Sequence, residues 1–373
     1  PGPAYGQMEI SMERPVFKAV GTPVEELDTP ALVVDVGSVK HNIAEAHGAF
    51  ASGPSLLRPD VHSHLCPAIA AMQLDAPGTV GGVAVSTVGE AEVFSENGVS
   101  DILVRNLLVT KSKIVRACGV ASRCSITVVV ESTANANLLS QIASESGVEL
   151  GVLAQVKSPG GQIGAASAEV ALALARAVLE LDGLLFKGLY AESEFPSEDA
   201  GSNTTQTLLE AKAALDNSGI DVPIVSVSAN EELFNSGGAE GITEVIAGAY
   251  ALMDNRHTAY HSNLRHAAKI LATIITHPEP EVAWLDTGQK ASSIDTGLPE
   301  VDGASGVSLS RMSAEHGGLV LEGDAQNSLN VGDKVWLIPS DIGNCVNVYD
   351  FIHAAENGAL KVVWDVAARG RYS

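Results

Sequence analysis

Apolar segments alternate with amphipathic segments along the chain from residue 28 to residue 265. The valine-rich run 29–36 (TPALVVDV) precedes 37–50, where Val39, Ile43 and Ala46 have helical spacing. Continuous apolar runs between amphipathic helices are typical of parallel β/α units. The pattern therefore predicts an α/β fold whose main domain is a (β/α)8 TIM barrel. Equivalent apolar runs, each followed by a helical pattern, lie at 80–87, 101–106, 125–132, 149–156, 185–192 and 223–229.

The pattern changes near residue 266. Short stretches rich in valine and isoleucine, such as 332–340 (GDKVWLIPS) and 359–366 (ALKVVWDV), are separated by glycine, proline and aspartate. This succession predicts short strands and turns. We therefore expect three parts, namely an N-terminal extension at 1–27 that packs with the β domain, a barrel at 28–265 and a C-terminal β domain at 266–373.

Composition narrows the classes of partner. The net charge of −23 argues against nucleic acid, because phosphate binding requires a basic surface. No apolar run approaches the ~18 residues of a membrane span, and the first residues lack the basic and apolar blocks of a secretory signal. The 4 cysteines form no CxxC pair, as expected of reduced thiols. We expect a cytoplasmic protein that binds a small molecule, with no nucleic acid and no membrane as partner.

The segment 58–65 (RPDVHSHL) carries the first candidate site. Active sites of TIM barrels lie where strands open into loops at their carboxyl ends, and this segment is expected at such a place. If the segment is extended, Asp60, His62 and His64 share one face. Two imidazoles in that arrangement are ligands for Zn or Fe. The alternative is that both histidines are hydrogen-bonded structural residues at a strand end.

Three further residues are candidates for acid–base catalysis. Glu192 and Glu194 follow the apolar run 185–192 with the spacing of one strand face, and His316 lies in 313–318 (SAEHGG). Clustered carboxylates repel one another unless they are protonated or bind a metal. We predict that these residues move protons. The alternatives are that the glutamates face solvent and that His316 orders a contact of the β domain.

Several longer motifs together resemble one family. The segments 86–106 (STVGEAEVFSENGVSDILVRN), 247–254 (AGAYALMD) and 284–299 (WLDTGQKASSIDTGLP) resemble the D-threonine aldolase and D-serine dehydratase group, relatives of alanine racemase. The resemblance extends from about residue 28 to residue 373. It implies a barrel with a β domain, pyridoxal phosphate as cofactor, and a homodimer whose sites lie at the interface.

The lysine that binds the cofactor in this family is replaced. The resemblance places the Schiff-base lysine at His62, and an imidazole cannot form the internal imine. Lys157, Lys187 and Lys290 are the other lysines considered, and none of them matches the family position. Pyridoxal phosphate is therefore not the expected cofactor.

The resemblance also locates the family's phosphate loop and ring-binding arginine. The arginine position is occupied by Gln162. The phosphate loop, which uses glycine N–H groups in the family, contains no glycine here and precedes Glu231 and Glu232, whose charge repels an anion. The residues at the loop position are Ser226, Val227, Ser228 and Ala229.

The family's metal motif is changed as well. In 339–350 (PSDIGNCVNVYD), Asp341 stands at the histidine position and Gly343 at that of the second ligand. We predict a divalent metal ion (Zn, Mn or Fe) held by His62, His64 and Asp341.

Three functions remain open from the sequence. The leading hypothesis is an enzyme without pyridoxal phosphate that uses a divalent metal for lyase or hydrolytic chemistry on a small polar hydroxy acid or hydroxy amino acid. The second is a pyridoxal phosphate lyase of the parent type. The third is a non-catalytic binding homologue.

Overall fold

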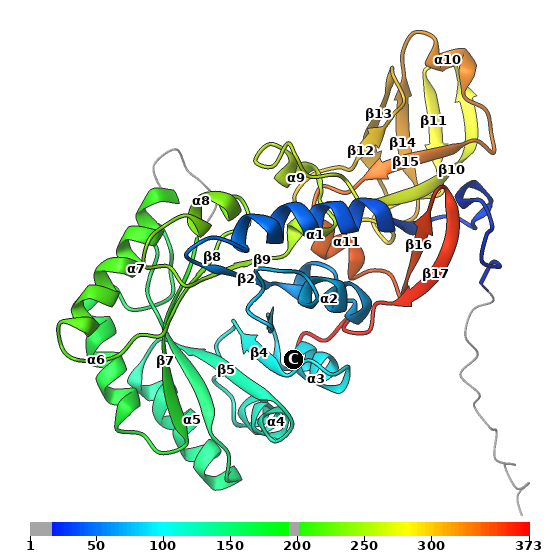
Figure 1. Ribbon diagram of the computed structural model, residues 1–373. Coiled ribbons are helices and arrows are strands. Elements are labelled where there is room, and N and C mark those ends of the chain that lie inside the picture. The colour runs from blue at the N-terminus through cyan, green and yellow to red at the C-terminus, as the bar shows by residue number, and fades with distance from the viewer. Residues whose placement is uncertain (1–16, 194–200) are drawn as a thin grey trace, which may run out of the picture.

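The computed structural model describes residues 17–193 and 201–373, which form two sheets. Eight parallel strands form a nearly closed barrel, and a nine-stranded sheet, mostly antiparallel, forms a second domain (Figure 1). The long helix α1 (Val36–Phe50) connects the second sheet to the barrel. The predicted α/β fold with a TIM barrel and a β domain is confirmed.

The barrel strands are short and almost entirely buried. Their order is β2-β9-β8-β7-β6-β5-β4-β3, and isolated bridges from Leu57 to Thr79 and from Asp60 to Ala84 join the two ends. Strands packed on both faces have apolar residues at successive positions, and these strands could therefore be predicted from the sequence. The strands are β2 (Leu56–Pro59), β3 (Val83–Val85), β4 (Asp101–Val104), β5 (Ser125–Val130), β6 (Leu150–Gln155), β7 (Leu184–Glu192), β8 (Ile224–Ser228) and β9 (Glu244–Ala247).

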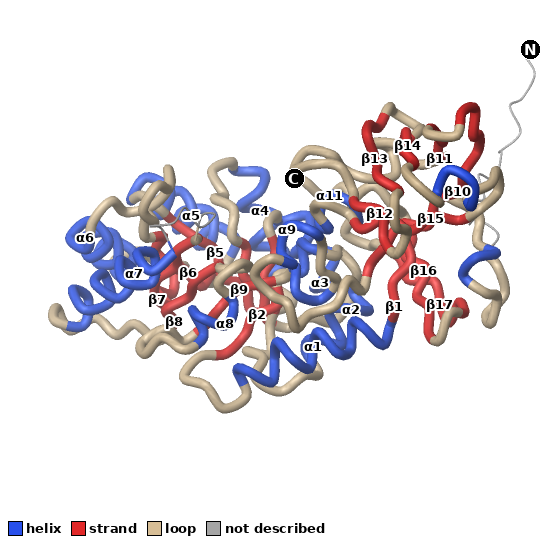
Figure 2. Tube along the Cα trace, turned by 90° about the horizontal axis from the view of Figure 1, so that it is seen from above, coloured by secondary structure: helices blue, strands red, loops and turns tan. Residues whose placement is uncertain are grey.

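Helices surround the barrel strands in one lobe, as Figure 2 shows from above. Thr87, Thr110, Ser132 and Ser167 each cap a helix by accepting a hydrogen bond from a backbone N–H of the first turn. These caps fix where each loop at the carboxyl end of a strand stops. The helices are α2 (Pro67–Leu74), α3 (Val88–Glu96), α4 (Lys111–Ala121), α5 (Thr133–Ser146), α6 (Ala168–Leu179), α7 (Gly201–Asp216) and α8 (Leu233–Gly237).

The second sheet includes one strand from the start of the chain. Strand β1 (Ala31–Asp35) pairs with β10 (Ala268–Glu279) and β16 (Phe351–Glu356). The expectation that 29–36 opens the barrel was therefore wrong, because an apolar run does not reveal which buried sheet it joins. The other strands are β11 (Val282–Leu285), β12 (Glu300–Asp302), β13 (Val307–Met312), β14 (Gly317–Leu321), β15 (Lys334–Ile338) and β17 (Ala359–Asp365).

Residues 17–27 lie against this second domain. The backbone N–H of Gly21 donates to the carbonyl oxygen of Leu360 at 2.8 Å, and that of Val24 donates to Gly358 at 3.0 Å. The part of the N-terminal segment that the structure describes thus adds to the edge at β17.

Two further observations concern membrane spans and cysteines. Among them, no helix is long and apolar enough to cross a bilayer. All four cysteines are free thiols, and Cys66, Cys118 and Cys345 are buried. The cytoplasmic location stays a prediction.

Candidate active site

A polar pocket of about 470 Å³ opens at the carboxyl ends of the barrel strands. The loops after β2, β4, β7, β8 and β9 reach it, together with a segment of the β domain at 341–344. Its ionisable side chains are five carboxylates, two arginines and two histidines: Asp60, Glu192, Glu231, Asp254, Asp341, Arg105, Arg256, His62 and His257.

The loop that carries the two predicted histidines turns instead of continuing as a strand. Strand β2 ends at Pro59, and the Asp60 carboxylate accepts the backbone N–H of His62 at 3.2 Å, capping the 3₁₀ turn η2 (Val61–Ser63). Gly248 follows β9 beside this turn, and a Cβ there would overlap with the carbonyl oxygen of Asp60. Because the segment is not extended, His62 and His64 do not share a face.

His62 is an oriented imidazole at the edge of the pocket. Its Nδ1 lies 2.8 Å from Oε1 of Glu90, a carboxylate whose side chain is only 3% exposed. The other oxygen of Glu90 accepts the backbone N–H of Ser86 at 2.8 Å. Burial alone lowers the pKa of His62, but the hydrogen bond and charge of Glu90 raise it above its ordinary value. The contact occupies Nδ1 and leaves Nε2 for a ligand.

His64 belongs to a buried hydrogen-bond network. Its Nδ1 accepts the backbone N–H of Cys66 at 3.1 Å, so Nε2 carries the proton that is donated to Oε1 of Gln73 at 3.0 Å. Gln73 in turn donates to the hydroxyl of Tyr250, which also contacts His47. Burial lowers the pKa of His64 to about 4. His64 is 0% exposed and both of its ring nitrogens are hydrogen-bonded, so this geometry does not favour its predicted role as a metal ligand.

Arg105 holds three strand ends together. Its Nη2 lies 2.8 Å from Oδ2 of Asp60, and its Nη1 lies 3.1 Å from Oε1 of Glu192. Burial alone lowers the pKa of this guanidinium, but the charges of Asp60 and Glu192 raise it above its ordinary value. Glu192 lines the pocket with 53% of its side chain exposed, and its catalytic role stays a prediction.

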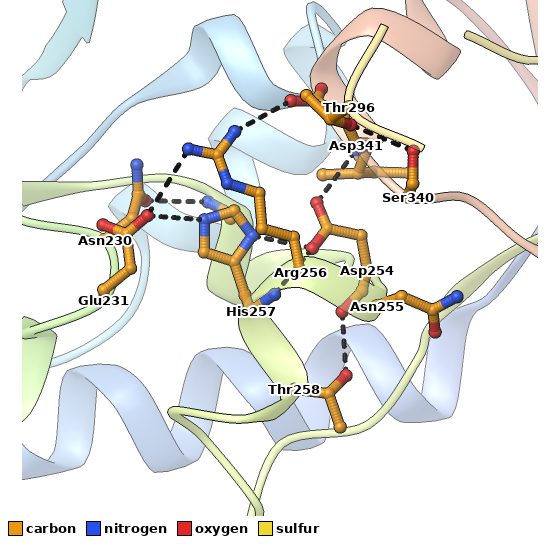
Figure 3. Close-up of polar contacts among 12 residues, drawn as sticks. Asn230, Glu231, Asp254, Asn255, Arg256, His257, Thr258, Thr296, Ser340 and Asp341 are labelled. Atoms are coloured by element: carbon orange, nitrogen blue, oxygen red, sulfur yellow. Dashed lines mark hydrogen bonds and ion pairs between the residues drawn. The ribbon is translucent and has the colours of Figure 1, made fainter. Parts of the chain in front are cut away.

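Arg256 lies in the pocket wall between the carboxylates of Glu231 and Asp341 (Figure 3). Its guanidinium nitrogens are 3.8 Å from Oε1 of Glu231 and 3.6 Å from Oδ2 of Asp341. Arg256 is part of the short helix α9 (Asn255–Thr258), whereas Asp341 caps α11 (Ile342–Val346) of the β domain by accepting the N–H of Asn344.

The two domains are also joined beneath this ion pair. The Asp254 carboxylate contacts Nδ1 of His257 at 2.7 Å through one oxygen. Its other oxygen accepts the backbone N–H of Ile342 at 2.9 Å. The loop after β9 and the start of α11 are thus fixed to each other, so the barrel and the β domain both form this pocket.

Comparisons with known proteins match the whole architecture. The family described as "Alanine racemase, N-terminal domain" matches residues 34–255, and a serine dehydratase domain family matches residues 267–355. The chain belongs to the D-threonine aldolase and D-serine dehydratase-like family of alanine racemase-type proteins.

Its relatives in this family are enzymes. The chain is 29% identical over 392 residues to 3-hydroxy-D-aspartate aldolase of Paracoccus denitrificans, covering 98% of both chains. It is 29% identical to D-threo-3-hydroxyaspartate dehydratase of Delftia sp., covering 73% of this chain and 74% of that one. The crystal structure of D-threonine aldolase from Filomicrobium marinum superposes with a TM-score of 0.90 at 28% identity, covering 96% of this chain and 100% of that one.

The three lysines considered as cofactor anchors do not line the pocket. In the part of the chain that the structure describes, no lysine lines the pocket. Lys187 contacts Ser125 and Thr127 near the amino end of the barrel, and Lys290 pairs with Glu315 on the β domain. Lys157 follows β6 and does not line the pocket either. The family's covalent anchor has no equivalent among these side chains.

Two backbone donors at the mouth of the barrel are bonded to a side chain. The side-chain oxygen of Asn230 accepts two backbone N–H groups, those of Gly248 at 2.9 Å and Ala249 at 3.2 Å. These donors at the end of β9 are the kind that binds a phosphate in a barrel mouth. Of the four residues at the predicted loop position, only Ser228 lines the pocket, and the hydroxyl of Ser226 is bonded to Glu244. The residues present do not fit pyridoxal phosphate.

The predicted metal site lacks a complete ligand set. His64 is committed to the buried network, and Asp341 is bonded to the N–H of Asn344 and lies beside Arg256. In the described ranges, no group of three or more His, Cys, Asp or Glu residues is placed to hold a metal ion. The expected set of His62, His64 and Asp341 is thus replaced by one imidazole and one carboxylate in separate contacts.

The structure describes only one of the two remaining predicted catalytic residues. Glu194 is outside the described residues. His316 is exposed on the β domain near Lys290, and it does not line the pocket of its own chain. A role for His316 in catalysis would require the β domain of a second copy.

Sequence reasoning missed the partners of the candidate residues. Glu90 and Arg105 stand within the 86–106 motif that identified the family, and Arg256 follows the 247–254 motif. Their positions in or next to these motifs could have marked them as candidate site residues. Asn230 lies in the stretch 226–232 that resembles the phosphate loop, but its contact with the end of β9 depends on where that strand lies in space.

Proposed function

We propose that this protein is a lyase-type enzyme that transfers protons on a small hydroxy amino acid or hydroxy acid without pyridoxal phosphate, with His62 as the acid–base residue. The observation that carries the proposal is the 2.8 Å contact between Nδ1 of His62 and Glu90 at the edge of the pocket. A buried carboxylate that orients an imidazole fixes its tautomer and prepares the other nitrogen for proton transfer.

The retro-aldol reaction illustrates what this pair would do. Nε2 of His62 takes the proton of the β-hydroxyl group, the C–O bond becomes a carbonyl, and the Cα–Cβ bond breaks. The electron pair of that bond passes to Cα and the adjacent substrate carboxylate, Cα takes the proton from Nε2 of the imidazolium, and the imidazole returns to its neutral form. Glu90 stabilises the imidazolium in between. The relatives that cleave or dehydrate D-hydroxy amino acids support this class of substrate.

The sequence led to a metal-dependent form of the same activity. Its ligand set does not fit, since His64 is buried and Asp341 is paired, so the proposal assigns no step to a metal. The non-catalytic alternative is opposed by the exposure of His62, whose side chain is 40% exposed beside a carboxylate that is almost fully buried.

Turnover by purified, cofactor-free protein tests the proposal. D-threonine and 3-hydroxy-D-aspartate are incubated with protein that shows no visible absorbance band of an imine, with and without a chelator. We expect the carbonyl product or the dehydration product to form in both cases, and we expect the same activity from protein that is treated with borohydride and dialysed before the substrate is added. Product formation only after pyridoxal phosphate is added, or no product with any hydroxy acid, would contradict the proposal.

A further inference from the structure

The segment 366–373 leaves the β domain and crosses to the barrel. Its first residue follows β17, and the backbone N–H of Val366 donates to the carbonyl oxygen of Asp350 at 2.9 Å. From there the chain runs to the side of α3, as the red end of the ribbon in Figure 1 shows. Val366 and Ala368 are 4% and 1% exposed. Because its apolar residues are buried and its backbone is hydrogen-bonded, the segment is packed against the protein instead of fraying.

The segment contacts the loop that carries His62. The backbone N–H of Ala368 donates to the carbonyl oxygen of Leu65 at 3.1 Å. Leu65 lies just beyond η2, the turn that contains His62, and its φ of 53° is in the left-handed region. A residue other than glycine adopts this conformation only where its surroundings hold it. The hydrogen bond from Ala368 is therefore one of the contacts that fix the course of this loop.

The same segment contacts the first turn of α3, which carries Glu90. The hydroxyl of Thr87, the cap of this helix, donates to the carbonyl oxygen of Arg371 and accepts the backbone N–H of Glu90 at 3.2 Å. Gly89 leaves the necessary space, since a Cβ there would lie 3.0 Å from the carbonyl oxygen of Arg371 and closer still to an oxygen of Ser373. The segment thus packs directly on the turn that positions Glu90.

Helix α11 holds the far end of the segment. The side-chain oxygen of Asn347, at the carboxyl end of α11, accepts the backbone N–H of Gly370 at 3.0 Å, and its side-chain nitrogen donates to the hydroxyl of Tyr372. The ion pair of Arg369 with Asp350 is exposed and contributes little. Hydrogen bonds of the backbone and of Asn347 therefore keep the segment in place.

The two members of the proton-transfer pair come from different elements. His62 belongs to η2 and Glu90 to α3, and the chain between them includes α2 and β3. Their contact of 2.8 Å is retained only if both elements stay in place, because a hydrogen bond weakens steeply once its atoms move apart. The 366–373 segment is hydrogen-bonded to both elements, through Ala368 and Arg371. It therefore connects the two halves of the pair from outside the pocket.

We propose that the 366–373 segment positions His62 against Glu90, and that Thr87 is the positioning residue through which it acts on Glu90. The segment lies wholly within the described part of the chain, and none of its residues lines the pocket. Its contribution is therefore to the geometry of the pair and not to ligand binding. The effect on turnover rests on the proposed function, whereas the effect on the two loops does not.

A chain that lacks residues 371–373 tests the proposal, since it loses the acceptor of Thr87 but keeps the bond from Ala368. We expect kcat to fall by about tenfold and KM to stay within about twofold, because a misaligned pair transfers protons slowly while the pocket wall is intact. If the shortened chain does not fold, Thr87→Ala is expected to lower kcat similarly, while Thr87→Ser keeps the hydroxyl and retains it. Lys361→Ala, which removes an exposed ion pair on β17, is the control with unchanged kcat.

Hydrogen exchange of the same proteins separates this inference from the proposed function. We expect the backbone amides of 60–66 and 86–92 to exchange at least about tenfold faster in the shortened chain, with those of β5 unchanged. A folded shortened chain with unchanged kcat, or with unchanged exchange in both stretches, would overturn the inference. If the unmodified chain shows no turnover, the proposed function fails, and the exchange of the two stretches alone decides whether the segment holds them.

Discussion

His62 and His64 have opposite environments although they are two positions apart. One imidazole is bonded to a carboxylate and partly exposed, and the other is enclosed among neutral groups. The pKa of His62 is raised and that of His64 falls to about 4. Of the two, only His62 lines the pocket, where its imidazole can exchange a proton with a ligand.

Glu90 controls the proton affinity of His62. The neutral form of His62, which acts as the base, dominates above the raised pKa of this residue. Activity that needs the base therefore rises as the pH passes through that pKa. We expect Glu90→Gln to move this rise to lower pH and to lower kcat by about tenfold or more. Glu92→Gln, on the same helix but paired with Arg116, serves as the control. A pH–rate profile that is the same in both variants would argue against the pair.

Restoring a lysine does not restore the cofactor site. In His62→Lys we expect no borohydride-sensitive visible band after addition of pyridoxal phosphate, because Asn230 occupies the N–H groups of Gly248 and Ala249. Absorbance spectroscopy after dialysis measures this directly. Formation of a stable imine would show that the phosphate position is open after all.

Part of this site could be predicted from the sequence and part could not. The motif around residue 62 identified the position of the replaced lysine, because the neighbouring residues resemble the family pattern. The assumption of an extended segment failed at Asp60, whose side chain caps a turn. A side-chain cap of this kind depends on local geometry that the spacing of two histidines does not encode.

At the scale of elements, the buried network anchors the loop after β2 to α2 and to the turn after β9. His64, Gln73 and Tyr250 connect these elements through side-chain hydrogen bonds. Since Gln73 and His64 are 0% exposed, bulk solvent cannot replace a lost partner in the network.

This network makes the fold sensitive to acid. The pKa of His64 is lower in the folded chain than the ordinary 6.5, so the unfolded chain binds the proton more tightly and stability falls as pH drops from about 6.5 toward about 4. We expect the free energy of unfolding to be lower at pH 5 than at pH 7 by about 2 kcal/mol from His64. Urea unfolding at both values measures the difference, and a stability that does not fall at pH 5 would contradict this account.

The β/α units were predictable because each buried strand carries its own apolar signature. The strands from β3 to β8 match the expected runs, except that β7 begins one residue earlier, at Leu184. Strand β1 has the same signature but joins the other sheet, since its partners β10 and β16 lie more than two hundred residues away in sequence. Which sheet a strand joins is a property of long-range pairing, and local periodicity does not contain it.

At the scale of the whole molecule, the β domain contributes to the pocket of its own chain. Asp254 bonds the backbone of Ile342, and Arg256 pairs with Asp341, so the two domains are fixed at the pocket. We expect Asp341→Asn to weaken this contact and to alter ligand binding more than stability, because the pair with Arg256 at 3.6 Å is partly exposed.

We also propose a homodimer, in which His316 reaches the pocket of the partner subunit. The surface near His316 includes Trp284, with Arg311 stacked 4.5 Å above its ring, and the half-exposed Ile275. Analytical ultracentrifugation is expected to give twice the 38.5 kDa chain mass. A monomer at micromolar concentration would contradict the dimer and remove His316 from consideration.

The most direct test of the account is the turnover rate of a D-hydroxy amino acid by protein that contains no pyridoxal phosphate, compared with that of His62→Gln. The account predicts measurable turnover by the unmodified chain and a loss of at least about a hundredfold in kcat for the variant, with folding unchanged by circular dichroism. An unmodified chain that turns over substrate only when pyridoxal phosphate is supplied, or a His62→Gln variant with full activity, would contradict it.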